Sequence, residues 1–149
     1  METNKINFSV GFITLCQLFR KTYKSIKKNF NITQNEMRIL IIVYHFEPDS
    51  IKKISERLAL SPTLTSKTLA TLEKKELIKR ELNSQDKRFE KVILTEKGIR
   101  VTCLIAEFIE KFFSENVLKL MGQESDYLLK FSHHMKNKIN INEQIFNSN

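Results

Sequence analysis

Apolar residues recur at spacings of three and four along most of the chain, which predicts a protein built mainly from amphipathic helices. The first helix is expected over residues 5–31, with a broad aromatic stripe on one side and Lys and Arg on the other. A stripe this wide needs more than one neighbouring element to cover it. We therefore expect a partner chain to bury part of this helix.

Helix start signals divide the next part of the chain. Thr33-Gln34-Asn35-Glu36 is a capping box and predicts an almost wholly apolar, central helix that ends before Glu47-Pro48-Asp49. Ser50 predicts the N-cap of a short helix, and Ser61-Pro62 predicts the start of another that ends near residue 75. Two short helices joined by a tight turn form a helix-turn-helix.

The hydrophobic period changes after this pair of helices. Residues 79–82 and 89–94 are predicted to be strands, and the polar cluster 83–87 connects them. Such a hairpin is marginal alone and must pack on the helices, so residues 33–95 are expected to form a winged-helix lobe. Thr95 is predicted to cap a helix that runs to about residue 121, and a last helix is expected over residues 127–139. The expected fold class is mainly α with a small two-stranded β-wing, in a single chain of 149 residues.

Composition excludes several classes of protein. With 3 Gly, the chain has no phosphate-binding loop of the GxGxxG or GxxxxGK type, and its 2 Cys cannot staple a disulfide scaffold. The longest apolar run, residues 39–44, is far shorter than a membrane span, and the N-terminus does not resemble a signal peptide. We expect a cytoplasmic protein that is not an enzyme and needs no cofactor, because no nucleophile–base pair or paired carboxylates emerge from the sequence.

The positive charge is concentrated in the predicted winged helix. The whole chain carries a net charge of +8, and residues 50–91 alone hold 11 Lys and Arg against 6 Asp and Glu. Basic excess in one segment is typical of proteins that bind a polyanion, nucleic acid before membrane. A solvated, lysine-rich surface is the alternative interpretation of the same composition.

The region from Ile51 to Gly98 resembles the MarR family (multiple antibiotic resistance regulators). The similarity is carried by residues 54–61, by residues 72–80, and by Asp86-Lys87-Arg88 followed by the segment 92–98 with its Leu-Thr-x-x-Gly pattern. The resemblance implies a symmetric homodimer in which the first and last helices interlock, here residues 5–31 and 96–141. It also implies a repressor that a small ligand, a metal or an oxidant releases from double-stranded DNA.

Several residues depart from the pattern of that family. Glu76 stands where the family often has Gly, and a left-handed backbone there costs about 1 kcal/mol without Gly. Asn83 replaces a frequent Asp at the wing tip. Leu64, Leu69 and Leu72 are expected to face inward, but threonines occupy positions 65 and 68, where the family prefers apolar residues. Whether Leu64 or Thr65 faces inward therefore stays open.

The N-terminal residues of a recognition helix are those that reach base edges in the major groove. In the predicted recognition helix, residues 61–75, the candidate DNA contacts are Ser61, Pro62, Thr63, Thr65, Ser66 and Lys67. The wing, residues 83–88, is expected to place Lys87 and Arg88 at the minor groove, and the resemblance implies that Asp86 holds the wing arginine. The candidates for phosphate contacts are Lys52, Lys53, Lys74, Lys79 and Lys91.

Regulatory chemistry is less well marked. Cys16 and Cys103 are most simply small hydrophobic residues, with oxidant sensing as the alternative. His45 and the adjacent His133 and His134 do not have the spacing of metal ligands, so no metal site is predicted. From the resemblance alone, an effector pocket between the lobes would be lined by Phe12, Cys16, Tyr44, His45 and Phe108.

The sequence thus predicts a sequence-specific DNA-binding regulator that reads a palindromic site as a homodimer. The alternative is a winged helix that serves as a protein-interaction or architectural module. The two hypotheses differ in salt dependence, because only a phosphate-binding surface releases many counterions from DNA.

Overall fold

The computed structural model describes residues 2–46, 50–82, 90–118 and 130, with side chains for residues 9–46, 50–81, 91–116 and 130. The chain divides into two compact units, Met1–Gln34 and Asn35–Asn149. Within the described residues, no helix is both long and apolar enough to cross a membrane.

The first unit consists of one long helix, α1 (Glu2–Phe30), which confirms the helix predicted over this segment. Asn31 ends it with a left-handed backbone (φ 53°), a conformation that Asn tolerates better than most residues. Among the side chains of α1 that the structure describes, four large apolar ones are exposed: Val10, Phe12, Ile13 and Phe19. This apolar surface agrees with the expectation that a further partner covers the helix, which stays a prediction.

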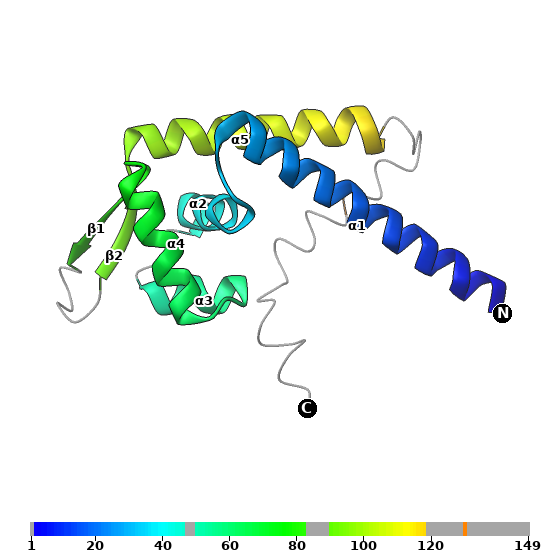
Figure 1. Cartoon of the computed structure of the whole chain (residues 1–149), viewed down its shortest axis with the longest axis horizontal. Coiled ribbons are helices and arrows are strands. Elements are labelled where there is room, and N and C mark those ends of the chain that lie inside the picture. Colours follow the sequence, from blue (N-terminus) through cyan, green and yellow to red (C-terminus); the bar gives the residue numbers. More distant parts are fainter. Residues whose placement is uncertain (1, 47–49, 83–89, 119–129, 131–149) are drawn as a thin grey trace. The chain divides into compact units, whose positions relative to one another are not determined.

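The second unit contains the helix-turn-helix and the hairpin in the predicted order. Its helices are α2 (Gln34–Phe46), which begins at the end of the first unit, α3 (Ile51–Leu58), α4 (Pro62–Lys74) and α5 (Glu96–Phe113). In Figure 1, α2 (cyan) lies between α5 above it and α3 below it, with α4 and the two strands at one end. One turn of π-helix, Ser114–Leu118, follows α5. The predicted last helix, residues 127–139, lies outside the described residues except for Lys130.

The hairpin consists of β1 (Ile78–Leu82) and β2 (Glu90–Leu94), which pair antiparallel. Ile78 lies opposite Leu94, and Arg80 lies opposite Val92. Ile78, Val92 and Leu94 are buried, so one face of the two-stranded sheet packs into the core as the marginal stability of an isolated hairpin requires.

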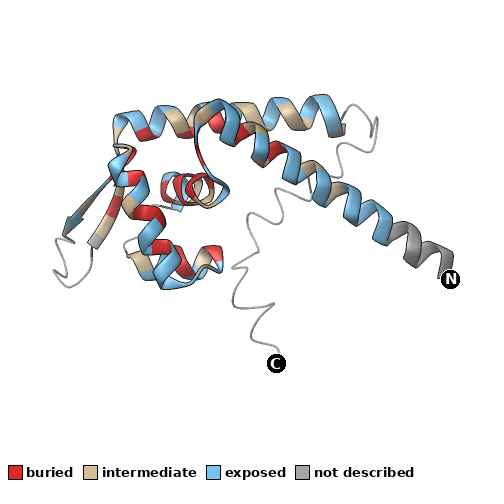
Figure 2. Cartoon of the chain, viewed as in Figure 1, coloured by how far each residue is buried: buried red, intermediate tan, exposed pale blue. Residues whose placement is uncertain are grey.

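The core of the second unit is built around α2, whose buried residues appear red in Figure 2. Met37, Ile39, Leu40 and Val43 are buried on several sides of this helix, which confirms its predicted central position. The other elements contribute the remaining buried apolar residues: Ile54, Leu58, Leu69, Leu72, Leu77, Ile78, Val92, Leu94 and Ile105. One face of α4 therefore packs on this core, and the opposite face points outward.

Candidate nucleic-acid interface

The turn between α3 and α4 has a fixed backbone geometry. Ser50 caps α3 by accepting a hydrogen bond from the Lys53 amide at 3.3 Å. At the other end Ala59 is left-handed (φ 50°), and the Leu60 amide donates to the Ser55 carbonyl at 3.0 Å. Such bonds satisfy carbonyls that the last turn of a helix would otherwise leave unpaired.

Arg38 on α2 supplies a further cap for α3. Its guanidinium donates to the Leu58 carbonyl oxygen at 2.6 Å, across 20 positions of sequence. A charged donor of this kind makes a stronger hydrogen bond than a neutral one. The end of α3, and with it the turn that leads to α4, is therefore tied to the central helix.

The beginning of α4 presents polar side chains outward. Ser61 is its N-cap, accepting from the Leu64 amide at 3.2 Å, and Pro62 is the first helical residue, both as predicted. Ser61, Pro62, Thr63, Ser66 and Lys67 are all exposed. The structure thus brings five of the six candidate base contacts together on the accessible N-terminal turns of one helix.

Thr65 is the exception, and the expectation that it contacts DNA is wrong. Its side chain is 0% exposed, and its hydroxyl donates to the Ser61 carbonyl at 3.1 Å. Ser55 Oγ on α3 lies 3.0 Å from Thr65 Oγ1 and also 3.0 Å from the Ile51 carbonyl. Because a hydroxyl has one proton, Ser55 divides it between these two acceptors. The buried pair joins the two helices of the helix-turn-helix.

Leu64 faces outward in consequence, contrary to the expectation that it joins Leu69 and Leu72 in the core. Its side chain is 40% exposed, whereas Leu69 and Leu72 are fully buried. Thr68 is buried too, and its hydroxyl donates to the Leu64 carbonyl at 2.8 Å. The rotation of α4 therefore places two threonines inside and one leucine outside.

The far end of α4 is fixed by a buried ion pair. Lys75 Nζ lies 2.8 Å from Glu36 Oε2, and the Glu36 side chain is only 3% exposed. A buried carboxylate is tolerated when a cation and hydrogen bonds compensate for its lost hydration. The sequence predicted Glu36 only as part of a capping box, and no local signal points to a partner 39 positions away.

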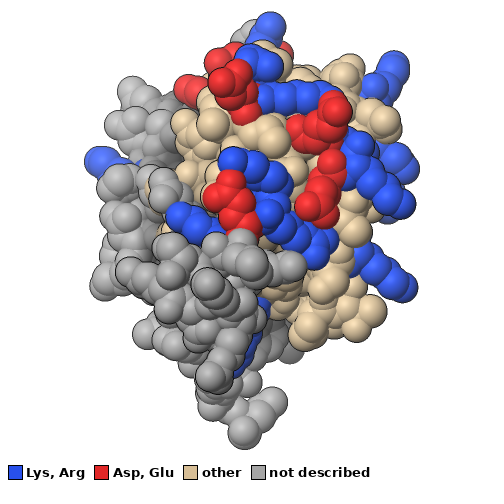
Figure 3. Space-filling view, turned by 90° about the vertical axis from the view of Figure 1, so that its left-hand side faces the viewer, with Lys and Arg blue, Asp and Glu red and all other residues tan. Residues whose placement is uncertain are grey.

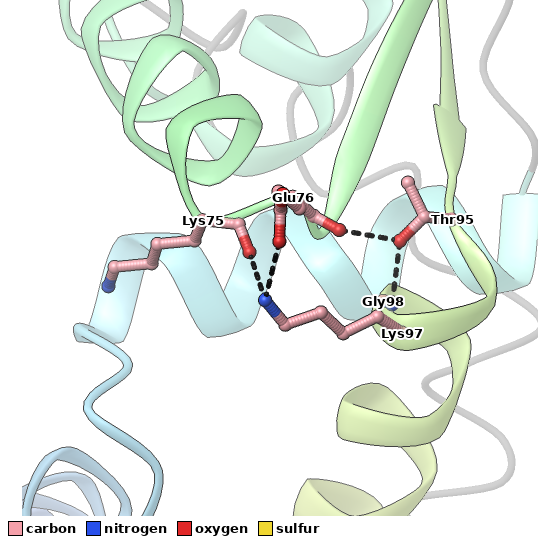
Figure 4. Close-up of polar contacts among 5 residues, drawn as sticks. All are labelled: Lys75, Glu76, Thr95, Lys97 and Gly98. Carbon is pink, nitrogen blue, oxygen red and sulfur yellow. Dashed lines mark hydrogen bonds and ion pairs between the residues drawn. The ribbon is translucent and has the colours of Figure 1, made fainter.

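Figure 4 shows how the end of α4 is joined to the start of α5. Glu76 is left-handed (φ 60°), as the resemblance implied, and its carbonyl accepts from the Thr95 hydroxyl at 2.7 Å. Thr95 Oγ1 in turn accepts from the Gly98 amide at 2.9 Å and caps α5. Lys97 Nζ donates to the Lys75 carbonyl at 2.9 Å and lies 3.1 Å from the Glu76 carboxylate.

Gly98 is required by close packing at the same junction. A Cβ atom on this residue would lie 1.9 Å from the Leu77 carbonyl oxygen, which itself accepts from the Thr95 amide at 3.1 Å. The Leu-Thr-x-x-Gly segment therefore has a physical role in this chain. It holds the return strand and α5 against the end of α4.

The cations around this lobe differ in their partners. Lys52 lies 3.7 Å from Glu56, Lys79 2.5 Å from Glu81, and Arg80 3.4 Å from Glu73. Figure 3, which faces the hairpin end of the molecule, accordingly shows acidic side chains among the basic ones. Within the part of the chain that the structure describes, no ion pair involves Lys67 or Lys74, and both are exposed.

The remaining predicted site residues are placed only in part. Lys53 is exposed and Lys91 is half-buried. The wing residues Asn83, Asp86, Lys87 and Arg88 lie outside the described residues, so their predicted roles stay predictions.

The predicted effector pocket stays a prediction, because its residues belong to both units of the chain. Tyr44 and His45 are exposed at the end of α2, while Phe108 is half-buried and stacks on Phe112 with ring centroids 6.4 Å apart. Phe12 and Cys16 are exposed on α1. A hydrogen bond from the Tyr44 hydroxyl to the Cys103 sulfur, and then the charge of the thiolate, raise the pKa of Tyr44. Among the described residues, no group of three His, Cys, Asp or Glu side chains could hold a metal ion.

Both the sequence and the fold of this chain are similar to those of known proteins. Residues 32–89 match the model of the MarR family. The transcriptional regulator SarZ of Staphylococcus aureus is 30% identical over 95 residues, which cover 64% of this chain and 64% of SarZ. The chain therefore spans less than two thirds of the length of this curated relative.

Solved structures show the same fold at low sequence identity. A mutant of S. aureus MepR bound to an oligodeoxyribonucleotide is 20% identical and superposes with a TM-score of 0.63, over 87% of this chain and 95% of MepR. CouR from Rhodococcus jostii RHA1 bound to p-coumaroyl-CoA is 13% identical with a TM-score of 0.70, over 91% of this chain and 92% of CouR.

Proposed function

We propose that this chain is a transcriptional regulator of the MarR family that binds double-stranded DNA through the N-terminal turns of α4. The observation that carries the proposal is the exposed polar surface of Ser61, Thr63, Ser66 and Lys67 on a helix whose opposite side is buried. A helix of this kind fits the major groove of B-DNA, which admits one α-helix.

The chemistry of these side chains suits a duplex. Ser and Thr hydroxyls bond to base edges or phosphates, and Lys67 bonds to guanine acceptors or a phosphate. The positive end of the α4 dipole and its first amides favour phosphate as well. In this proposal the wing, residues 83–88, lies at the minor groove with Lys87 and Arg88.

We further propose that the regulator is a cytoplasmic homodimer that represses the genes it controls and reads a palindromic site. Support comes from the apolar surface of α1, including Phe12 and Phe19, and from exposed Ile99 and Leu104 on α5, which a second copy would cover. Two lobes related by a two-fold axis would contact half-sites about 10 bp apart. The CouR complex supports the further proposal that a small molecule controls DNA binding.

The test is fluorescence anisotropy with a labelled duplex from the chain's own upstream region, in excess unrelated competitor DNA. We expect tight binding that falls about 10³–10⁵-fold between 50 and 200 mM salt if the dimer contacts about 6–10 phosphates. Equal affinity for unrelated duplex would contradict sequence-specific recognition.

Two lysine variants locate the contact surface. Lys67→Ala should weaken binding and reduce the salt slope by about 2, because each subunit of the proposed homodimer loses one phosphate contact. Lys111→Ala is the control, because Lys111 is also exposed but lies in the last turn of α5, at the end of that helix away from α4, and pairs there only with exposed Glu115 at 4.0 Å among the described residues. If both variants bind as the wild type does, the first turns of α4 do not contact the duplex.

The second candidate function is a protein-interaction or architectural module. It is favoured by the ion pairs of Lys52, Lys79 and Arg80, which neutralise part of the basic surface. A protein-binding winged helix would show a shallow dependence of DNA binding on salt. The slope of the anisotropy titration therefore separates the two functions.

A further inference from the structure

Leu64 is the one large apolar side chain exposed on α4 in the described part of the chain, with 40% of its surface accessible. It is the third residue of the helix and lies one turn after Ser61 and one turn before Lys67. The three side chains form a row along the exposed face, because residues three apart are neighbours on a helix. The middle position of the candidate DNA-binding row is thus apolar.

The outward position of Leu64 is fixed by the interior of the lobe. Turning α4 to bury Leu64 would expose fully buried Leu69 and break the contact of Thr65 with Ser55, whose oxygens are 3.0 Å apart. The Ser61 N-cap, which accepts from the Leu64 amide itself, holds the same turn in place. Hydropathy alone would place leucine inside and threonine outside, so the observed arrangement gives up apolar burial at this site.

The side chains around Leu64 are suited to contact both polar and apolar groups of a base pair, and they do not form an apolar docking patch. Its exposed neighbours Pro62, Thr63 and Ser66 are small or polar, so among the described residues of α4 Leu64 is the only large apolar side chain that is exposed. Protein-docking surfaces present contiguous apolar patches of a few hundred Å² or more. In the major groove, by contrast, thymine presents a single apolar group, the C5-methyl, among hydrogen-bonding groups.

We propose that Leu64 is a specificity-determining residue that packs on the C5-methyl group of a thymine in the major groove. The inference rests on the proposed function, since it requires α4 to lie in that groove. It assigns a distinct base preference to the middle of the row, between the positions that Ser61 and Lys67 contact.

The experiment uses a duplex that the wild-type chain selects from a randomised library. Each thymine of the selected site is replaced in turn by uracil, which keeps base pairing and removes only the methyl group. Affinity is measured for the wild type, for Leu64→Ala and for Leu64→Met, which retains an apolar side chain of similar volume. The Thr71→Ala variant is the control, because Thr71 is exposed on α4 but is not among the candidate DNA contacts.

We expect one thymine per half-site at which uracil weakens wild-type binding about fourfold, the worth of one buried methyl group. Leu64→Ala should lose affinity for the thymine site and become nearly indifferent to uracil there, while Leu64→Met and Thr71→Ala should keep the discrimination. Specific binding in which uracil has the same effect on the wild type and on Leu64→Ala at every position would overturn the inference and leave the proposed function standing. Failure of the wild type to select any site would overturn both.

Discussion

The left-handed residue at the end of α4 predicts that glycine is more stabilising than alanine at position 76 and less stabilising than alanine at position 73, one helical turn earlier. Glu76 has φ 60°, a region that costs an L-residue about 1–2 kcal/mol relative to glycine. The greater freedom of glycine in the unfolded chain returns about 0.5–1 kcal/mol of that difference. Glu76→Gly should therefore be more stable than Glu76→Ala by about 0.5–1 kcal/mol.

Comparing Gly with Ala removes the contribution of the carboxylate. Both variants lose the ion pair with Lys97, in which the side chains of Lys97 and Glu76 are 52% and 81% accessible. Both keep the backbone carbonyl of residue 76 that accepts from Thr95. Glu73 is the control, because it is the penultimate residue of α4 and is not left-handed. There the Gly variant should be less stable than the Ala variant by about 1 kcal/mol.

The four variants can be compared by urea unfolding at one protein concentration, since the midpoint of the proposed dimer would depend on concentration. A difference of about 1 kcal/mol moves the midpoint by about 0.3–1 M for an ordinary m-value. If glycine is no better than alanine at position 76, the left-handed strain does not exist in solution. If both positions favour alanine, helix propensity alone explains the result.

The remaining predictions concern the packing and ionisation of the same lobe. Gly98→Ala should lower the free energy of unfolding by about 1–3 kcal/mol in thermal melts, because the added methyl group overlaps a backbone carbonyl; an unchanged melting temperature would contradict this close approach. Thr65→Val should leave DNA affinity unchanged and stability within about 1 kcal/mol, since Ser55 keeps another acceptor; a large loss of affinity would place Thr65 at the DNA. Cys103→Ala should lower the pKa of Tyr44 toward its ordinary 10.0 in an absorbance titration. The raised pKa implies that Tyr44 contributes to folding stability fully below pH 10 and that this contribution is lost as the pH rises through the pKa of the folded state. A Tyr44 titration that Cys103→Ala leaves unaltered would exclude the hydrogen bond.

The elements of the winged helix could be predicted because their signals are local. Ser50, Ser61 and Thr95 each accept a hydrogen bond from the amide three residues later, in agreement with their predicted roles as N-caps. The change from helical to alternating periodicity marks the hairpin in the same way. Each of these signals depends on residues a few positions apart, which the sequence presents directly.

The rotation of α4 and the partner of Glu36 could not be predicted because both depend on contacts between distant segments. Hydropathy ranks leucine above threonine as a core residue, but Thr65 gains a buried hydroxyl partner on α3 that no local pattern reveals. Glu36 begins as a helix-start signal and is neutralised by Lys75 from the far end of α4. In each case the polar side chain can be buried because a partner from a distant segment forms a hydrogen bond or ion pair with it.

The net charge of a segment can likewise be predicted from the sequence, whereas the ion pairs of its individual cations cannot. The excess of Lys and Arg over residues 50–91 indicates a polyanionic partner but does not say which cations would meet it. A phosphate that approaches Lys79 or Arg80 competes with a carboxylate already within 3.4 Å. A phosphate that approaches Lys67, in the second turn of α4, meets an exposed cation that has no ion pair within the described residues. Lys67 lies among the candidate base contacts, so part of the affinity of the proposed DNA binding depends on the same surface as its specificity.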